Sequence, residues 1–175
     1  MRLFISLPFD ESVKKQITAV QDRLREICPK GNFTRPENFH LTLAFLGEIP
    51  HSRVELICQV MDGVCFPSFP LAFERAGSFR RDNGDLWWIG AAPNPSLLQM
   101  QKSLAQGLEQ AGFQIDKRKF LPHLTIARQV QGNPPNGKQL LQVPFSAPAE
   151  KICLMCSERT GGRLVYTELY QRRCQ

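Results

Sequence analysis

The sequence predicts a bilobal α+β fold: two largely antiparallel sheets related by a pseudo-twofold axis around a central cleft, with helices packed on the outer faces. Strand segments of alternating polarity follow one another in hairpin order, and amphipathic helices lie between them. The two halves also echo each other, each with a helix, a basic linker and a histidine-containing strand. With 175 residues, 42% of them apolar, the chain suits one domain or two lobes sharing a core.

The N-terminal segment predicts a strand, a helix and a second strand. Residues 2–7 alternate as a strand, and Asp10 is the expected N-cap of the helix that follows. That helix has one continuous apolar stripe, made of Val13, Ile17, Val20, Leu24 and Ile27. Breaker residues at 28–32 close it. A histidine strand follows residues 35–38 and ends at Gly47.

A second helix and a hairpin follow. Residues 52–55, Ser-Arg-Val-Glu, have the form of a capping box and predict a helix to about Val64. Strands are predicted at 71–78 and 86–91, and the polar residues 81–85 form the turn between them.

The second half repeats this pattern. Asn94 and Pro95 predict a helix start, and Gly112 can end the helix. Its apolar stripe consists of Leu97, Met100, Leu104, Leu108 and Ala111. The second histidine strand is predicted at 122–128, followed by a breaker-rich loop at 131–137. Two final strands are predicted near 145–157 and 163–171, joined by the turn at 160–162.

Composition narrows the class of protein. The net charge of +6 favours an anionic partner. No apolar run has the length of a membrane span, and the N-terminus turns polar by Asp10 without a signal-peptide cleavage pattern, so we expect a cytoplasmic protein without a membrane partner. The six scattered cysteines predict free buried thiols. Cys153 and Cys156, three apart on a predicted strand, face opposite ways and suit neither a metal nor a disulfide.

A short motif occurs twice. His40-Leu41-Thr42-Leu43 recurs as His123-Leu124-Thr125-Ile126, which places two of the three histidines in the same pattern. Residues two apart on a strand share a face, so each copy projects an imidazole and a hydroxyl side by side. If the two strands face one another across a cleft, one bound group meets two histidines and two threonines.

This set of side chains suits displacement at phosphorus. One neutral imidazole can accept a proton while a protonated one donates, and each threonine can hydrogen-bond a phosphoryl oxygen. The scheme needs neither metal nor cofactor, and the nearest carboxylates, Glu48 and Asp116, form no familiar ligand cluster with the histidines. A single copy would favour a histidine satisfied within a sheet; the repetition favours an active site. The third histidine, His51, is expected to be exposed beside a helix cap and to have no role in the site.

The repeated motif and its surroundings resemble the 2H phosphoesterase superfamily, and within it the bacterial RNA 2′,3′-cyclic phosphodiesterases, also called 2′-5′ RNA ligases. The matching segments are residues 2–8, 35–48, 86–90 and 120–128. The resemblance implies one bilobal 2H phosphoesterase domain over 1–175, with hydrolysis of a terminal 2′,3′-cyclic phosphate to a 2′-phosphomonoester. It further implies that His40 is the proton donor and His123 the proton acceptor. The reverse reaction would be ATP-independent 2′-5′ ligation.

For several neighbouring residues the sequence allows more than one role. Arg128 is a further phosphate-binding candidate, although simple alternation places it opposite His123 unless a bulge or a strand end intervenes. Residues 117–119, Lys-Arg-Lys, are either an electrostatic guide for RNA or a solvated turn. By parity Phe45 points to the core. For base stacking the candidates are Phe9, Trp87 and Trp88, and one of the two tryptophans should be core.

The expected partners are RNA with 2′,3′-cyclic phosphate ends, such as tRNA fragments, or small cyclic nucleotides, bound by a monomer. A related alternative is a 2H phosphodiesterase acting on another substrate, such as 2′-5′ oligonucleotides or ADP-ribose cyclic phosphate. A third hypothesis, from another class, is a non-catalytic RNA-binding module; the intact histidines of both motifs argue against it.

Overall fold

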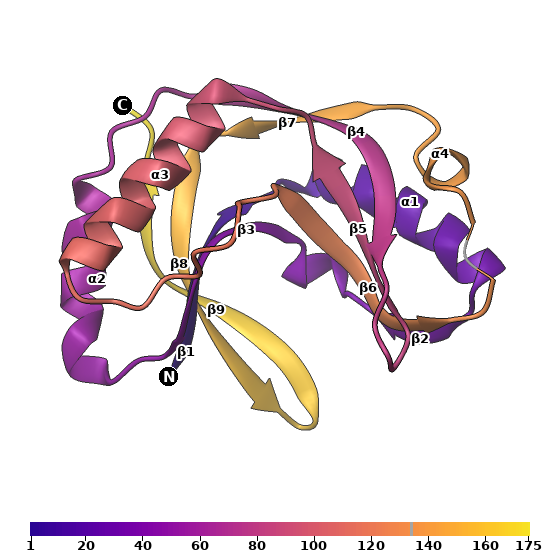
Figure 1. Cartoon of the computed structure of the whole chain (residues 1–175), viewed down its shortest axis with the longest axis horizontal. Helices are drawn as coiled ribbons and strands as arrows, with labels where there is room; N and C mark the ends of the chain where they lie inside the picture. Colours follow the sequence, from indigo (N-terminus) through magenta and orange to yellow (C-terminus); the bar gives the residue numbers. More distant parts are fainter. Residues whose placement is uncertain (134) are drawn as a thin grey trace.

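The computed structural model describes residues 1–133 and 135–175 and consists of one curved sheet with helices around it (Figure 1). The strands are β1 (Arg2–Pro8), β2 (Lys30–Phe33), β3 (His40–Glu48), β4 (Phe69–Phe79), β5 (Asp85–Ala91), β6 (His123–Gln131), β7 (Phe145–Ala149), β8 (Lys151–Thr160) and β9 (Arg163–Arg173). The helices are α1 (Glu11–Ile27), α2 (Val54–Asp62), α3 (Pro95–Gln110) and α4 (Gly137–Leu140), with single 3₁₀ turns η1 (Pro36–Asn38) and η2 (His51–Arg53).

The strands of the described residues form one nine-stranded sheet, so the prediction of two separate sheets is wrong. The order is β7-β4-β5-β6-β3-β1-β8-β9, with β2 added on β6, and neighbouring strands are antiparallel. The two halves of the sheet join where β3 meets β6, at the pair Leu41 and Leu124. Both side chains are fully buried, and this contact fuses two small sheets into one continuous surface.

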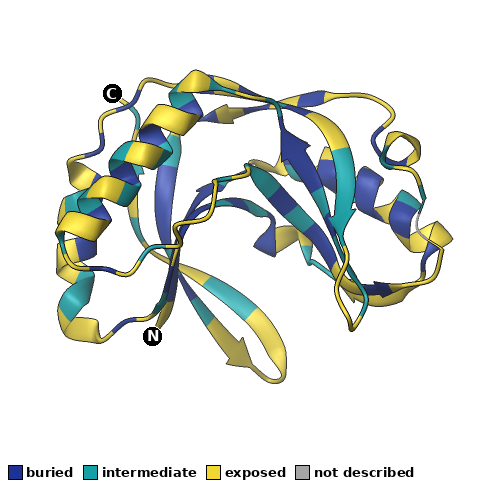
Figure 2. Cartoon of the chain, in the orientation of Figure 1, coloured by how far each residue is buried: buried dark blue, intermediate teal, exposed yellow. Residues whose placement is uncertain are grey.

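Two lobes can be defined from this sheet. The first lobe contains β3, β1, β8 and β9 with α2 and α3, and the second contains β2, β6, β5, β4 and β7 with α1 and α4. The helices lie on the outer side of the curved sheet, as expected (Figure 1). Their buried stripes face the strands, and their exposed residues face outwards (Figure 2).

The helix starts follow the predicted caps in two of three cases. The Asp10 side chain accepts a hydrogen bond from the amide of Val13 at 2.8 Å, and Asn94 accepts one from Leu97 at 2.9 Å. The capping box predicted at Ser52 is wrong. Instead η2 runs directly into α2, whose N-cap is Arg53 and makes no side-chain cap hydrogen bond.

Three elements differ from the predicted succession. β2 forms within residues expected to be breakers, because it extends the sheet beside β6. Within the predicted loop 131–137, Gln131 still belongs to β6 and Gly137 begins α4, while residue 134 lies outside the described residues. The single strand predicted at 145–157 is two strands that separate at Glu150. β7 pairs with β4 and β8 with β1, so the chain passes here from the second lobe to the first.

Among the described residues, no helix has the length and apolar character of a membrane span.

The six cysteines are all free thiols. Only Cys28, Cys153 and Cys156 are buried, so the prediction of buried thiols holds for half of them. Burial and the nearby Glu168 carboxylate raise the pKa of Cys153 to about 12, which leaves this thiol protonated and unreactive near neutral pH.

Candidate active site

The junction between the lobes brings both histidine motifs together. Leu41 of β3 pairs with Leu124 of β6, and the residues on either side of that pair point to the opposite face. Because the strands are antiparallel, His40 lies across from Thr125, and Thr42 lies across from His123. These four side chains are all half-buried. The junction therefore presents two imidazoles and two hydroxyls on one surface, in pseudo-twofold arrangement.

Each imidazole is held by a backbone carbonyl two residues earlier. Nδ1 of His40 lies 2.7 Å from the carbonyl oxygen of Asn38, and Nδ1 of His123 lies 2.6 Å from that of Leu121. A carbonyl oxygen only accepts, so Nδ1 donates its hydrogen in both rings. This leaves Nε2 of each ring to take up or give a proton. Nε2 of His40 lies 3.0 Å from the Thr42 hydroxyl.

Aromatic side chains flank both histidines. The His40 ring forms a three-ring cluster with Phe4, at 4.8 Å between centroids, and Tyr166 of β9, edge-on at 5.2 Å; Phe4 and Tyr166 also contact each other, at 4.9 Å. The His123 ring is edge-on to Phe79 at 5.6 Å and to Trp88 at 6.4 Å. These contacts limit rotation of the imidazoles and exclude water from one side of each. Tyr166 had no signal in the sequence, because it belongs to a strand far along the chain.

The tryptophan pair divides as predicted. Trp87 is buried in the core, whereas Trp88 is half-buried on the side of His123. The Trp88 indole lies so close to Gly77 that a Cβ there would come within 2.7 Å of the ring, and a Cβ at Gly90 within 3.0 Å. Two glycines thus make room for the indole to lie flat against the sheet.

A β-bulge in β3 changes the faces of the residues after Thr42. The register with β1 passes from Thr42 to Ala44, so Leu43 is an extra residue. Leu43 and Ala44 are both buried, and Phe45 is 46% exposed beneath the guanidinium of Arg2, 5.1 Å from its ring centroid. The prediction that Phe45 points to the core is therefore wrong, because strict alternation does not continue through a bulge.

β6 has the corresponding bulge. Its register with β5 passes from Thr125 to Ala127, leaving Ile126 as the extra residue. Ile126 and Ala127 are both buried, and Arg128 is exposed. The bulge removes the parity objection to Arg128, which now follows His123 and Thr125 on the same face. In the pseudo-twofold, Arg128 occupies the place that Phe45 has in β3.

Electrostatics agree with this placement of Arg128. Burial lowers the pKa of His40 from its usual 6.5, the Asn38 carbonyl partly opposes this, and the charges of Arg128 and His123 lower it further. The charge of Arg128 also lowers the pKa of Tyr166, although burial raises it more. In the free protein His40 is accordingly biased towards the neutral imidazole.

Phe9 is buried and lines a small pocket of about 70 Å³ beside His40. The pocket also contacts Phe4, Ser6 and Tyr166. Its small volume leaves Phe9 at the edge of the site, without a free face for stacking a base.

The remaining charged candidates are exposed or paired with other groups. His51 is exposed in η2. Arg118 is paired with Asp116, whose pKa its hydrogen bonds lower to about 2, so the basic run 117–119 carries an internal counter-charge. The carboxylate of Glu48 lies 3.5 Å from the N-terminal amine. In residues 1–133 and 135–175, no three His, Cys, Asp or Glu side chains are grouped to hold a metal ion.

Comparison with known proteins places this geometry in a family. The family described as "LigT like Phosphoesterase" matches twice, at residues 7–88 and 89–166, in line with the pseudo-twofold. An RNA 2′,3′-cyclic phosphodiesterase of Thermotoga maritima is 30% identical over 184 residues, covering 100% of this chain and 95% of that protein. A second RNA 2′,3′-cyclic phosphodiesterase, from Geobacillus stearothermophilus, is 31% identical over 75% of this chain. The matched region covers only 43% of that longer protein.

A solved structure agrees over the whole chain. The crystal structure of Escherichia coli LigT complexed with 3′-AMP has a TM-score of 0.81 and 26% identity, covering 99% of this chain and 97% of that one. Two matches to one family, a full-length relative and a common fold lead to the same conclusion: the chain belongs to the LigT-like phosphoesterases.

Proposed function

We propose that this protein hydrolyses the 2′,3′-cyclic phosphate at the end of an RNA to a 2′-phosphomonoester, without a metal ion, by acid-base catalysis between His40 and His123. The observation that carries the proposal is the pair of imidazoles fixed by their Nδ1 hydrogen bonds on either side of the Leu41 and Leu124 junction. The names of the relatives point to the same substrate class.

The proton balance of the reaction fits two histidines. Nε2 of His123 accepts a proton from water as its oxygen attacks phosphorus. The bond between phosphorus and the 3′-oxygen breaks, and Nε2 of His40 gives that oxygen a proton. The product carries a 2′-phosphate and a 3′-hydroxyl, and one proton has moved from one imidazole to the other. The direction of this transfer rests on the family resemblance, since the site itself is nearly symmetric.

The lowered pKa of His40 bears directly on its role as donor. A donor must be protonated when the 3′-oxygen leaves, yet the free cleft favours the neutral ring. A phosphoryl group bound between the histidines carries negative charge, and a nearby opposite charge favours the imidazolium. Substrate binding therefore supplies the charge that makes His40 an acid.

The other polar groups bind the phosphoryl oxygens in this proposal. Thr42 and Thr125 each donate a hydroxyl hydrogen bond to a non-bridging oxygen, and Arg128 supplies a positive charge on the same face. Such preorganised donors act most strongly on charge that develops in the transition state. The bulge in β6 is the feature that gives Arg128 this position.

The same apparatus can act with a second nucleophile. A 5′-hydroxyl can take the place of the water, and its attack on the cyclic phosphate forms a 2′-5′ linkage as the 3′-oxygen leaves. One phosphate ester bond, to the 3′-oxygen, is exchanged for another, to the 5′-oxygen, so the reaction needs no ATP. We propose this ligation as a secondary activity when 5′-hydroxyl ends are abundant.

The test is hydrolysis of a 2′,3′-cyclic mononucleotide in EDTA, with separation of the 2′ and 3′ product isomers. We expect only the 2′-phosphate, and a loss of about 10²- to 10⁴-fold in kcat for His40→Ala and for His123→Ala. His51→Ala is the matched control and should keep full activity. Hydrolysis that needs added metal, or that survives both substitutions, would overturn the proposal. Turnover only of 2′-5′ oligonucleotides would instead assign the site to that substrate.

A further inference from the structure

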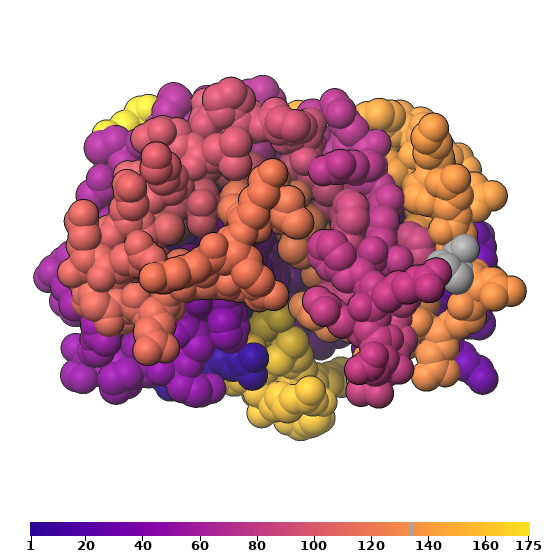
Figure 3. Space-filling view, viewed as in Figure 1, coloured from indigo at the N-terminus to yellow at the C-terminus, as the bar shows by residue number. Residues whose placement is uncertain are grey.

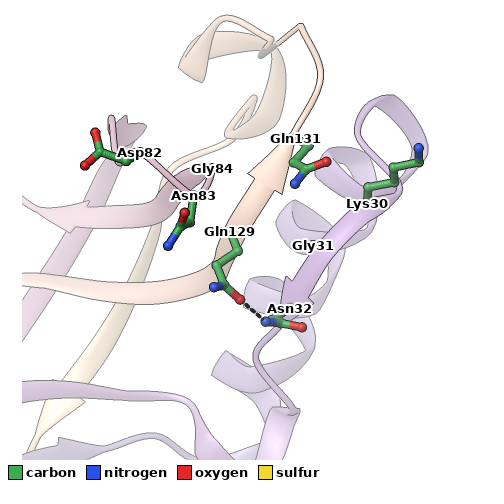
Figure 4. Close-up of a pocket in the computed structure, with 8 residues that line it drawn as sticks. All are labelled: Lys30, Gly31, Asn32, Asp82, Asn83, Gly84, Gln129 and Gln131. Atoms are coloured by element: carbon green, nitrogen blue, oxygen red, sulfur yellow. Dashed lines mark hydrogen bonds between the residues drawn. The ribbon is translucent and has the colours of Figure 1, made fainter.

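The second lobe carries a polar pocket of about 630 Å³ that the proposed reaction does not use. It lies between β2, the turn from β4 to β5 and the end of β6 (Figure 4). We call it the amide pocket. Its lining consists of Lys30, Gly31, Asn32, Asp82, Asn83, Gly84, Gln129 and Gln131. This volume is in the range of small-molecule binding sites.

The amide pocket continues the line of polar side chains along β6. His123, Thr125 and Arg128 follow one another on this strand, and the pocket begins at the next residue, Gln129. Gln129 is the sixth residue after His123 on the strand, a distance of roughly 20 Å at the usual rise per residue. A chain held by its terminal phosphate at His123 can therefore follow β6 to the pocket.

The backbone of the pocket is held in an unusual conformation. Among the described residues, Gln129 is the one non-glycine with a positive φ, at 54°. The turn packs so closely on it that a Cβ at Gly84 would come within 2.7 Å of the Gln129 carbonyl carbon. The side-chain oxygen Oε1 of Gln129 accepts a hydrogen bond from Nδ2 of Asn32, as Figure 4 shows. Costly conformations of this kind cluster at binding sites.

The chemistry of the lining selects the kind of ligand. Four carboxamides provide both donors and acceptors, and the charges of Lys30 and Asp82 offset each other. A lining with balanced charge suits a neutral polar group better than a phosphate. Its eight residues include no aromatic side chain, so a base would be held by its edge and not by stacking.

We propose that the amide pocket binds a nucleobase of the RNA upstream of the terminal cyclic phosphate, through hydrogen bonds to the polar edge of the base. This inference rests on the proposed function, because it takes the cyclic phosphate to be held at the histidines. The protein then binds RNA ends longer than a mononucleotide, and its second lobe contacts the RNA upstream of the cyclic phosphate.

The test compares kcat/KM for a 2′,3′-cyclic mononucleotide with that for oligoribonucleotides of increasing length that end in the same cyclic phosphate. We expect kcat/KM to rise once the chain is long enough to reach the pocket. The double variant Asn83→Ala/Gln131→Ala should lose about five- to tenfold on the long substrates, as expected for one or two lost hydrogen bonds, with the mononucleotide unchanged. Gln106→Ala, an exposed amide on α3, is the matched control.

A binding measurement separates this inference from the proposed function. Fluorescence anisotropy of a labelled oligoribonucleotide with the His40→Ala/His123→Ala protein reports the pocket without catalysis, and weaker binding after Asn83→Ala/Gln131→Ala supports it even if hydrolysis fails. Rates independent of length, or equal losses on short and long substrates, overturn it. A selective loss with Arg159→Gln/Arg163→Gln at the tip of the β8 and β9 hairpin overturns it too, by placing the chain along the first lobe.

Discussion

Tyr166 of β9 stands edge-on to the imidazole of His40, with ring centroids 5.2 Å apart and planes at 82°. The contact joins the C-terminal hairpin to a motif near the start of the chain. Burial is the largest cause of the lowered pKa of His40, and the tyrosine ring lies against this imidazole. Arg35 and Asn38 donate hydrogen bonds to the Leu164 carbonyl and hold the same hairpin in place.

The Tyr166 contact predicts different results for two substitutions. Tyr166→Ala should expose His40 to water, raise its pKa towards the usual 6.5, and lower kcat several-fold because the ring can rotate. Tyr166→Phe keeps the edge contact and should leave both nearly unchanged. NMR titration of the imidazole protons measures the pKa in each variant. An unchanged His40 pKa in Tyr166→Ala would show that the tyrosine does not shield the ring.

Arg128 should act on both substrate and His40. Arg128→Gln removes a charge that lowers the pKa of His40, so that pKa should rise in the free protein. The loss of a charged hydrogen bond to phosphate should raise KM by about tenfold or more. Arg128→Lys keeps the charge and should leave the His40 pKa near that of the parent. If Gln and Lys variants titrate alike, the charge of Arg128 does not reach His40.

The pH dependence should differ between kcat/KM and kcat. His40 must be protonated to act as donor, and its pKa in the free protein is lowered, so kcat/KM should fall as the pH rises through that lowered value. Bound phosphate favours the imidazolium, and the alkaline limb of kcat should therefore lie at higher pH. Rates measured from pH 5 to 9 on a cyclic mononucleotide, under conditions in which the chemical step limits the rate, give the alkaline limb of kcat/KM and that of kcat. The reverse order of the limbs would contradict the donor role of His40.

Gly77 should be sensitive to a single methyl group. Gly77→Ala places a Cβ within 2.7 Å of the Trp88 ring and must displace the indole that contacts His123. We expect a loss of stability of about 1–3 kcal/mol from overpacking, a shift in tryptophan emission and a lower kcat. Gly63→Ala is the matched control, because φ there is −72° and the nearest atom lies 3.5 Å away. Unchanged emission in Gly77→Ala would mean that the indole stays in place.

Local sequence patterns predicted the elements whose own residues determine them. The stripes of α1 and α3 and the caps at Asp10 and Asn94 carry their signal within a few residues. The exception is Ile27, the last residue of the predicted α1 stripe, which is 49% exposed. β2 and the separation of β7 from β8 depend on which distant strand accepts the hydrogen bonds, and nothing near residues 30–33 or Glu150 records that choice.

The site shows the same division. The repeated His-x-Thr motif predicted four side chains that the fold brings onto one surface, because it is a pattern of spacing. The sequence allowed a bulge before Arg128 but located neither bulge, since Leu43 and Ile126 look like ordinary apolar strand residues. The predicted position of Phe45 was wrong for that reason. Tyr166 was missed because only the fold brings it near His40.

The way the lobes are assembled has a consequence for the chain as a whole. The family match divides it at residues 88 and 89, but α1 from the first part packs on β6 and β7, while β8 and β9 from the second part complete the sheet around β1. Neither part contains a whole lobe. A cut at this boundary should give two fragments that stay unfolded alone and regain structure, and both histidines, only when mixed, as a split protein does.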